Sequence, residues 1–254
     1  MSSMTVSNNG LYNSYSHIAS GKRINTAADD AAGLAIGKKM EREETGLRVG
    51  ADNAKDGIGA LNVADGAMDG MMDYLQRIRE LALKSMNGLN SDTEKQMYQN
   101  EINQLKEGIQ SLAKDTTFNE QKLLDGSMAD MHLATNPDGG GMKIQMENST
   151  LEALGIADFD VTKSDFNLKD IDKAMDMISS RRGNIGAQTN RLEHTYNYNT
   201  AASLEQLNSR SRLEDLDMPK AISEKKRQEL MRDYGALMLR KRMEQDSLVT
   251  RLFQ

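Results

Sequence analysis

The chain has 254 residues, of which 28% are charged and only 4% are aromatic, a composition that disfavours a compact enzyme with one large core and favours long helices with apolar stripes. The net charge of −6 argues against binding of nucleic acid, and the absence of Cys excludes disulfides and thiolate metal sites. No run approaches the ~18 apolar residues of a membrane-spanning helix, so we expect no membrane partner.

The first strong helical pattern runs from about Asp29 to Asn87. Its apolar and small residues recur with a mean step of about 3.5 residues, which is typical of a coiled-coil-like helix. Several glycines lie within the pattern, and each would cost about 1 kcal/mol in an isolated helix. We therefore expect neighbouring backbones to pass close to this helix along much of its length.

A turn and a second helix follow. Asn87-Gly88-Leu89-Asn90 breaks the pattern, and the stretch from Ser91 to Glu94 is a capping box that starts the next helix. The apolar stripe of that helix keeps a helical step through Tyr98, Ile102, Leu105, Ile109 and Leu112. Because the connection is short, we expect the two helices to pair in an antiparallel manner.

The middle of the chain changes character between Phe118 and Gly155. Two short alternating segments flank the Gly-rich turn at 136–141, which predicts one β-hairpin and no other strand. Asp165 or Asn167 then caps a helix that begins near Leu168. Asp217-Met218-Pro219 interrupts this helix, and the last helix covers roughly 220–252.

These elements predict a mainly α fold, in which long antiparallel helical hairpins from both chain ends form a coiled-coil-like bundle that carries one small β-hairpin. The matching stripes near the two ends indicate that the terminal segments pair with each other. We divide the chain into an N-terminal inner segment (1–28), outer helices with the hairpin (29–170), a returning outer helix (171–210) and a C-terminal inner helix (211–254).

Catalytic chemistry finds no support. His17, His132 and His194 are far apart and lack the spacing of metal ligands. Asp29 and Asp30 could be a carboxylate pair, but without a nucleophile or cleft they are better explained as acidic residues at a helix N-terminus. We therefore expect no enzyme activity, no catalytic residue, no metal site and no cofactor.

Five stretches together resemble bacterial flagellins. They are S-G-K-R-I-N-T-A-A-D-D-A-A-G-L-A-I at 20–36, L-Q-R-I-R-E-L-A-L-K-S-M-N at 75–87, F-N-E-Q-K-L-L-D-G at 118–126, R-R-G-N-I-G-A-Q-T-N-R-L-E-H-T at 181–195 and S-R-L-E-D-L-D-M-P-K at 211–220. They cover most of the chain in the order that the family shows. Only about forty residues separate the third stretch from the helix near Leu168, so the resemblance implies a minimal flagellin without variable outer domains.

The resemblance implies a structural subunit of the flagellar filament, which self-assembles by helix–helix packing into a helical tube for motility. It implies an extracellular location, with export by the flagellar type III system without a cleaved signal peptide. The implied partners are further copies of the chain, the flagellar export chaperone, the cap and junction proteins, and the Toll-like receptor that senses flagellin. The end helices are expected to order on assembly, because long stripes without neighbours cannot offset their ordering entropy.

The resemblance also assigns residues. Receptor binding is implied for Gln76, Arg77, Leu81 and Glu101, which could equally serve subunit contacts. For assembly, the small and charged residues after Ser20 are read as an interface together with the apolar C-terminus: Lys22, Arg23, Asp29, Asp30, Ala31, Ala32, Gly33, Leu248 and Leu252.

Two other functions remain open at this point. One is a hook–filament junction protein of the same family, which would adapt or cap a polymer without forming a long one. The other is a surface binding protein or immune ligand without a role in motility. The last helix, with its many Lys and Arg residues, is more charged than the family pattern leads one to expect.

Overall fold

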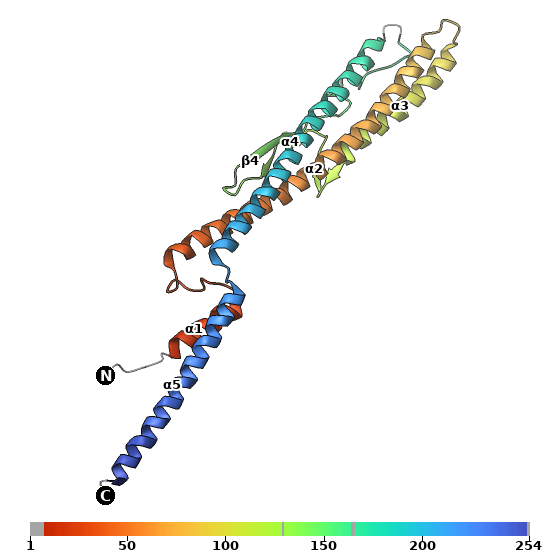
Figure 1. Cartoon of the computed structure of the whole chain (residues 1–254). Helices are drawn as coiled ribbons and strands as arrows, with labels where there is room; N and C mark the ends of the chain where they lie inside the picture. Colours follow the sequence, from red (N-terminus) through yellow and green to blue (C-terminus); the bar gives the residue numbers. More distant parts are fainter. Residues whose placement is uncertain (1–7, 129, 164–165, 253–254) are drawn as a thin grey trace. The chain divides into compact units, whose positions relative to one another are not determined.

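The structure is a computed structural model that describes residues 8–128, 130–163 and 166–252, with side chains described from 13 to 245 within those ranges (Figure 1). It contains five long helices in its described part: α1 (Asn8–Ser20), α2 (Ala31–Ser85), α3 (Asp92–Asp115), α4 (Leu168–Glu214) and α5 (Met218–Leu252). Contacts divide the chain into two units, one of residues 45–203 and one of residues 1–44 with 204–254. The mainly α class is confirmed, and the four-segment division stays a prediction.

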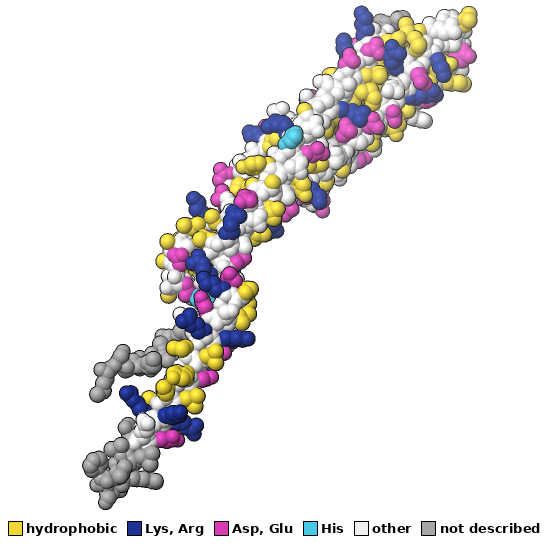
Figure 2. Space-filling view, in the orientation of Figure 1, with side chains coloured by type: hydrophobic (Ala, Val, Ile, Leu, Met, Phe, Trp, Pro, Cys, Tyr) yellow, Lys and Arg dark blue, Asp and Glu magenta, His cyan; other side chains and the backbone are white. Residues whose placement is uncertain are grey.

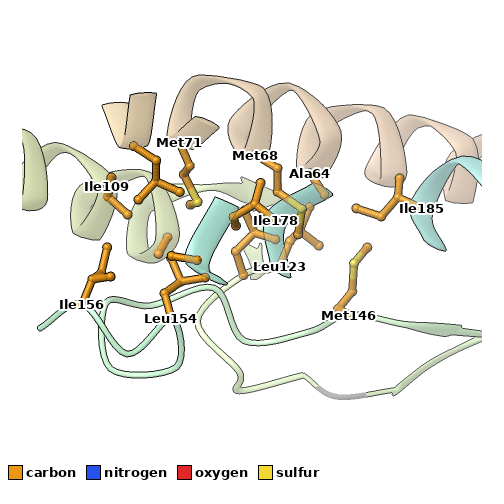
Figure 3. Close-up of a cluster of buried hydrophobic side chains, with 14 of the residues drawn as sticks. Ala64, Met68, Met71, Ile109, Leu123, Met146, Leu154, Ile156, Ile178 and Ile185 are labelled. Atoms are coloured by element: carbon orange, nitrogen blue, oxygen red, sulfur yellow. The ribbon is translucent and has the colours of Figure 1, made fainter. Parts of the chain in front are cut away.

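The core of the 45–203 unit lies between α2, α3 and α4 (Figure 1). The predicted stripes supply it, and Figure 3 shows side chains from all three helices meeting there. Fully buried members include Leu61, Met71, Leu75, Ile78, Ile102, Ile109 and Ile178. Burying one such side chain contributes about 1.5–3 kcal/mol, so this stripe-to-stripe packing is what makes the long helices stable.

The start of α3 follows the predicted capping box. The Ser91 hydroxyl accepts a hydrogen bond from the Glu94 backbone N–H at 3.3 Å, and the Glu94 carboxylate accepts from the Ser91 N–H at 2.7 Å. The Ser91 N–H and the Ser91 hydroxyl both donate to the Glu94 carboxylate and lower the pKa of Glu94, the backbone N–H contributing most. Two of the donors that a helix start leaves unpaired are thereby satisfied.

The predicted hairpin is formed by β3 (Asp130–Ala134) and β4 (Gly141–Gln145), which are antiparallel. A second small sheet, β1 (Thr117–Phe118) with β2 (Gln121–Lys122), was not predicted. Its two-residue turn has positive φ at Asn119 and Glu120, as a tight hairpin turn requires. The expectation of one hairpin was wrong here because Asn-Glu is a weaker turn signal than Asn-Gly.

Polar side chains of the helices hold the hairpin. Asn53 of α2 donates its Nδ2 to the Ala134 carbonyl, and Asn199 of α4 donates to the Thr135 carbonyl, both at 2.7 Å. Gly50 of α2 lies directly beneath, where an added Cβ would be 2.2 Å from the Thr135 oxygen. The expected close approach of a neighbouring backbone to α2 is therefore found at this glycine.

An irregular segment, residues 146–161, completes the core without joining a sheet. Its Leu154 and Ile156 are buried. On α3, the Lys106 ammonium donates to the Ala157 and Phe159 carbonyls, and burial lowers the pKa of this lysine. Gln99 and Gln110 of α3 accept from backbone N–H groups of the same segment. Side chains of α3 thus replace the strand partners that the segment lacks.

The ends of the later helices follow the sequence signals. Asn167 caps α4 by accepting from the Lys169 N–H at 3.0 Å, whereas the alternative cap Asp165 lies outside the described residues. The break at Asp217 is confirmed, since its side chain accepts from the Lys220 N–H at 3.2 Å and Pro219 occupies the first turn of α5.

In the unit of residues 1–44 and 204–254, α1 lies beside α5 (Figure 1). The Ser14 hydroxyl donates to Gln228, and the Tyr15 hydroxyl donates to Glu229 at 2.8 Å. Lys225 also lies 3.9 Å from the centre of the Tyr15 ring. The predicted pairing of helices from the two chain ends is therefore confirmed.

Candidate functional site

Two distant segments pair in a short antiparallel contact that we call the joint, defined as residues 16–37 with 213–216. The Arg23 N–H donates to the Glu214 carbonyl at 2.6 Å, and the Leu216 N–H donates to the Gly21 carbonyl at 2.9 Å. Lys22 and Asp215 form an isolated β-bridge between them. The joint lies within the unit of residues 1–44 and 204–254.

A buried carboxylate lies at the centre of the joint. Glu214 is only 5% exposed, and its carboxylate lies 3.1 Å from the Lys22 ammonium. Gly37 provides the room, since an added Cβ there would be 2.0 Å from the Glu214 Oε1. A buried charge is tolerated when it is paired, and Lys22 supplies this pairing for Glu214. No local pattern marks Glu214, because its partners Lys22 and Gly37 are 192 and 177 positions away in the chain.

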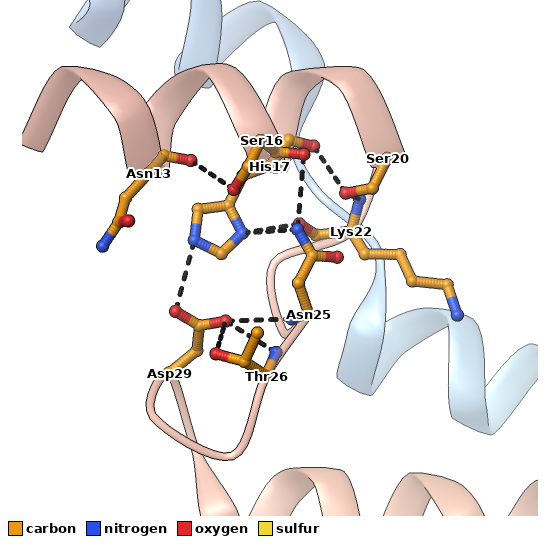
Figure 4. Close-up of polar contacts among 8 residues, drawn as sticks. All are labelled: Asn13, Ser16, His17, Ser20, Lys22, Asn25, Thr26 and Asp29. Atoms are coloured by element: carbon orange, nitrogen blue, oxygen red, sulfur yellow. Dashed lines mark hydrogen bonds and ion pairs between the residues drawn. The ribbon is translucent and has the colours of Figure 1, made fainter. Parts of the chain in front are cut away.

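The Asp29 carboxylate organises the turn before α2 (Figure 4). It accepts from the Asn25 N–H at 3.1 Å, the Thr26 N–H at 2.9 Å and the Thr26 hydroxyl at 3.0 Å. These bonds lower the pKa of Asp29, the Thr26 backbone contributing most. His17 of α1 lies 3.5 Å away through Nε2, and its Nδ1 is 3.0 Å from the Lys22 carbonyl. One carboxylate thus links the turn to the helix before it.

The Asp29 carboxylate gives the joint a testable pH dependence. Its folded pKa is lowered from the ordinary 3.8, so the ionised form stabilises the joint above that value, and the contribution is lost as the pH falls through the folded pKa. We expect the Asn25 and Thr26 amide signals to titrate together in NMR with a midpoint below 3.8. Asp29→Asn should abolish that titration and Asp30→Asn should preserve it. A midpoint at or above the ordinary value would contradict this role.

The small residues after Asp29 have two different environments. Asp30 caps α2 by accepting from the Gly33 N–H at 2.8 Å. Gly33 is buried in its own chain, where an added Cβ would be 2.7 Å from the Ile24 side chain. Ala31 and Ala32 are exposed. The small-residue stretch therefore serves close packing inside the joint at Gly33, whereas Ala31 and Ala32 have no packing role of this kind within the described part of the chain.

The structure thus brings seven of the nine predicted assembly residues together in the joint. Lys22 pairs with Glu214, and Arg23 donates to the Leu213 carbonyl at 2.7 Å. The contacts of these residues with a neighbouring subunit stay a prediction. Leu248 and Leu252 belong to α5, but their side chains lie outside the described residues.

The four predicted receptor residues lie on α2 and α3. The Arg77 guanidinium donates to the Glu101 carboxylate through Nε at 2.9 Å and Nη2 at 2.7 Å, and these bonds raise the pKa of Arg77. Gln76 is exposed beside them. Leu81, by contrast, is only 1% exposed and belongs to the core. The geometry therefore offers a polar patch of three residues at the surface, with the leucine beneath it.

The α5 helix carries exposed apolar side chains over most of its described length (Figure 2). They are Ile222, Leu230, Met231, Tyr234, Leu237, Met238, Leu239 and Met243, between 41% and 69% exposed. Successive helical residues point about 100° apart, so the consecutive Leu237, Met238 and Leu239 face three directions. We call this set the α5 apolar side chains. A helix of this kind is suited to contacts on several sides.

The three histidines lie in three different elements of the described part of the chain. His17, His132 and His194 lie in α1, β3 and α4, and among the described residues there is no group of three side chains able to hold a metal ion. No helix within those residues is long and apolar enough to cross a bilayer.

Known proteins match this chain over nearly its whole length. Residues 1–129 match the family model for the bacterial flagellin N-terminal helical region, and residues 168–253 match the one for the C-terminal helical region. The flagellin of Halalkalibacterium halodurans is 34% identical over 244 residues, which cover 93% of this chain and 89% of that protein. The flagellin of Bacillus subtilis is 35% identical, with 93% and 90% covered.

Two solved structures are similar. The crystal structure of Bacillus cereus flagellin aligns with a TM-score of 0.53 at 25% identity, covering 58% of this chain and 88% of that one. A putative flagellar hook-associated protein from Vibrio parahaemolyticus aligns with a TM-score of 0.60 over 74% of this chain and all of the other. At 17% identity, the second similarity concerns the fold alone.

Proposed function

This chain belongs to the bacterial flagellin family and is a structural subunit of the flagellar filament, and from this premise we propose that it polymerises through the α5 apolar side chains and the joint. The filament is extracellular, and the chain assembles with further copies of itself. The relatives are structural proteins, in keeping with the expectation that this chain is not an enzyme.

The observation that carries the proposal is the exposure of α5. Leu230 is 69% and Leu237 60% exposed in the isolated chain, although an isolated helix gains nothing from exposing such side chains. Covering one of them in a subunit interface contributes about 1.5–3 kcal/mol. The joint supports the same role, because it connects α1 and α5 within one subunit.

The direct test is polymerisation of the purified full-length chain. We expect filaments to grow from short filament seeds and to be visible by electron microscopy as long helical polymers. A chain that remains monomeric with seeds and under salting-out would contradict the proposal. A chain that forms only short caps on existing ends would instead support a hook–filament junction protein, an alternative that the family relatives do not favour.

We propose, in line with the resemblance, that the chain leaves the cell through the flagellar type III apparatus with an export chaperone and meets cap and junction proteins at the filament end. The exposed apolar character of α5 supports a chaperone, because such a helix needs covering before assembly. When the export apparatus is removed, we expect the protein to disappear from the culture medium. Unchanged secretion would exclude export by this route.

We propose that Gln76, Arg77 and Glu101 form the surface that the flagellin-sensing Toll-like receptor contacts, with Leu81 supporting the two helices from the core. The Arg77–Glu101 pair supports this by fixing a charged patch across α2 and α3. Arg77→Ala should weaken receptor binding by about tenfold, or 1.4 kcal/mol. Arg79→Ala is the matched control, since Arg79 pairs with Asp172 of α4 instead. Equal receptor binding by both variants would show that Arg77 is not part of the receptor-binding surface.

A further inference from the structure

The turn between α2 and α3 holds an Asn-Gly pair in an exposed position. Asn87 and Gly88 are both exposed, and the side-chain Oδ1 of Asn87 accepts a hydrogen bond from the Leu89 N–H at 3.2 Å. This bond closes an Asx turn around the intervening Gly88 nitrogen. The turn therefore holds the Asn87 side-chain carbon next to the main-chain nitrogen of the following residue.

The groups that would react are unengaged. In the described part of the chain, the Gly88 N–H donates to no acceptor and the Asn87 side-chain amide nitrogen makes no hydrogen bond. Donation from Leu89 to Oδ1 draws electrons from the side-chain carbonyl and makes its carbon a better electrophile. Glycine has no Cβ to shield its nitrogen, and an Asn followed by Gly is for that reason the pair most open to cyclisation.

We propose that Asn87 is a site of spontaneous modification to aspartate and isoaspartate. The Gly88 nitrogen gives its proton to hydroxide and bonds to the Asn87 Cγ, and the Cγ–Nδ2 bond breaks as the amide nitrogen takes up a proton and leaves as ammonia. Water then adds to either carbonyl of the cyclic imide and breaks that carbonyl's bond to the ring nitrogen. No oxidant or reductant is required.

Two other asparagines with part of this geometry are protected by hydrogen bonds. Asn148 makes the same turn with Thr150, but the N–H of its follower Ser149 donates to the Leu124 carbonyl at 2.8 Å. Asn90 precedes Ser91, and its side-chain amide donates to the Lys84 carbonyl at 2.6 Å. Asn148 therefore lacks a free main-chain nitrogen to attack it, and Asn90 lacks a free side-chain amide to leave.

One acidic counterpart, Asp125, is protected by its charge. Asp125 precedes Gly126 and accepts from the Ser127 N–H at 2.9 Å, in the same turn geometry. Hydrogen bonds from Ser127, the hydroxyl first, lower the pKa of Asp125. Its carboxylate therefore stays ionised, and a carboxylate is a poor electrophile. The neutral amide of Asn87 has no such protection.

Modification would add a charge between two exposed apolar side chains. Asn87 lies between Met86, which is 56% exposed, and Leu89, which is 91% exposed. It would place a negative charge just beyond the C-terminus of α2, where the helix dipole disfavours one. Isoaspartate would also lengthen the main chain of the turn by one methylene. Older subunits would therefore differ from new ones at this turn.

The test is peptide mapping of the full-length protein during incubation at mildly alkaline pH. We expect the tryptic peptide 85–95 to gain the mass of an amide-to-acid exchange, located by fragmentation at Asn87 and not at Asn90. Isoaspartate should be confirmed by its distinct retention time. The rate in the folded chain should stay within about tenfold of the rate in urea, a barrier difference of about 1.4 kcal/mol.

The matched variant is Gly88→Ala. A Cβ at this position meets no atom within 4 Å, so the variant should keep the fold, which circular dichroism would check. It should slow the modification by about tenfold or more, because the methyl group shields the nitrogen. The proposal would be overturned by an Asn87 that stays intact in the folded chain while it reacts in urea, by equal reaction at Asn90, or by an unchanged rate in the variant.

Discussion

Gly50→Ala is expected to destabilise the 45–203 unit by about 2–3 kcal/mol, the cost of forcing an extra methyl into a closely packed site. The new Cβ would lie 2.2 Å from the Thr135 oxygen and 3.0 Å from the Asn199 Nδ2. Because the first of these is a main-chain atom, the hairpin must move and the Asn199–Thr135 hydrogen bond must lengthen. Urea unfolding followed by circular dichroism would measure the change.

The same substitution at Gly66 is the matched control. Gly66 lies in the same helix, but a Cβ added there meets no atom within 4 Å. Gly66→Ala should therefore stabilise the chain by up to about 1 kcal/mol, the difference in helix propensity. If Gly→Ala lowers the free energy of unfolding at position 50 and raises it at position 66, the effect of close packing is separated from that of helix propensity. Equal effects would show that the Thr135 contact does not decide the role of Gly50.

Leu237→Glu is expected to raise the protein concentration needed for seeded filament growth by about a hundredfold, or 2.7 kcal/mol. The reason is that an interface covering this 60% exposed side chain would have to bury an unpaired carboxylate, a costly step. The folded chain itself should keep its urea midpoint, because the residue contacts mainly solvent there. Light scattering and electron microscopy would follow the growth.

Leu237→Met is the matched control, because it changes the side chain without adding a charge. It conserves volume and apolar character, so growth from seeds should stay close to that of the unchanged chain. Normal filament growth of the Leu237→Glu variant would show that this part of α5 does not lie in the subunit interface. A lowered urea midpoint in Leu237→Glu would instead indicate that the side chain supports the subunit fold.

Much of the helical architecture follows from local signals. The capping box at Ser91, the Asn167 cap and the break at Asp217 act within a few residues, so the sequence alone reveals them. The β1–β2 sheet escaped prediction because two residues per strand are too few to show alternation. Short elements of this kind are fixed by their surroundings rather than by their own pattern.

The site was harder to predict than the fold. The stretch after Ser20 identified the location of the joint. The roles of Glu214 and Gly37 become visible only in the folded chain, where Glu214 meets Lys22, 192 positions away, and Gly37, 177 positions away. Leu81 shows the reverse difficulty. Its place in a helical stripe does not reveal whether the stripe faces the core or a partner, and in the folded chain it faces the core.

The way α3 holds the irregular segment 146–161 bears on how this family can vary in length. Each polar side chain that fastens the segment meets one particular main-chain group, as Gln110 meets the Leu151 N–H and Lys106 the Phe159 carbonyl. Inserting or deleting a single residue between those points would shift the later groups out of reach and leave buried polar atoms unpaired. The segment looks like a loop, but its length is fixed as strictly as the register of a sheet.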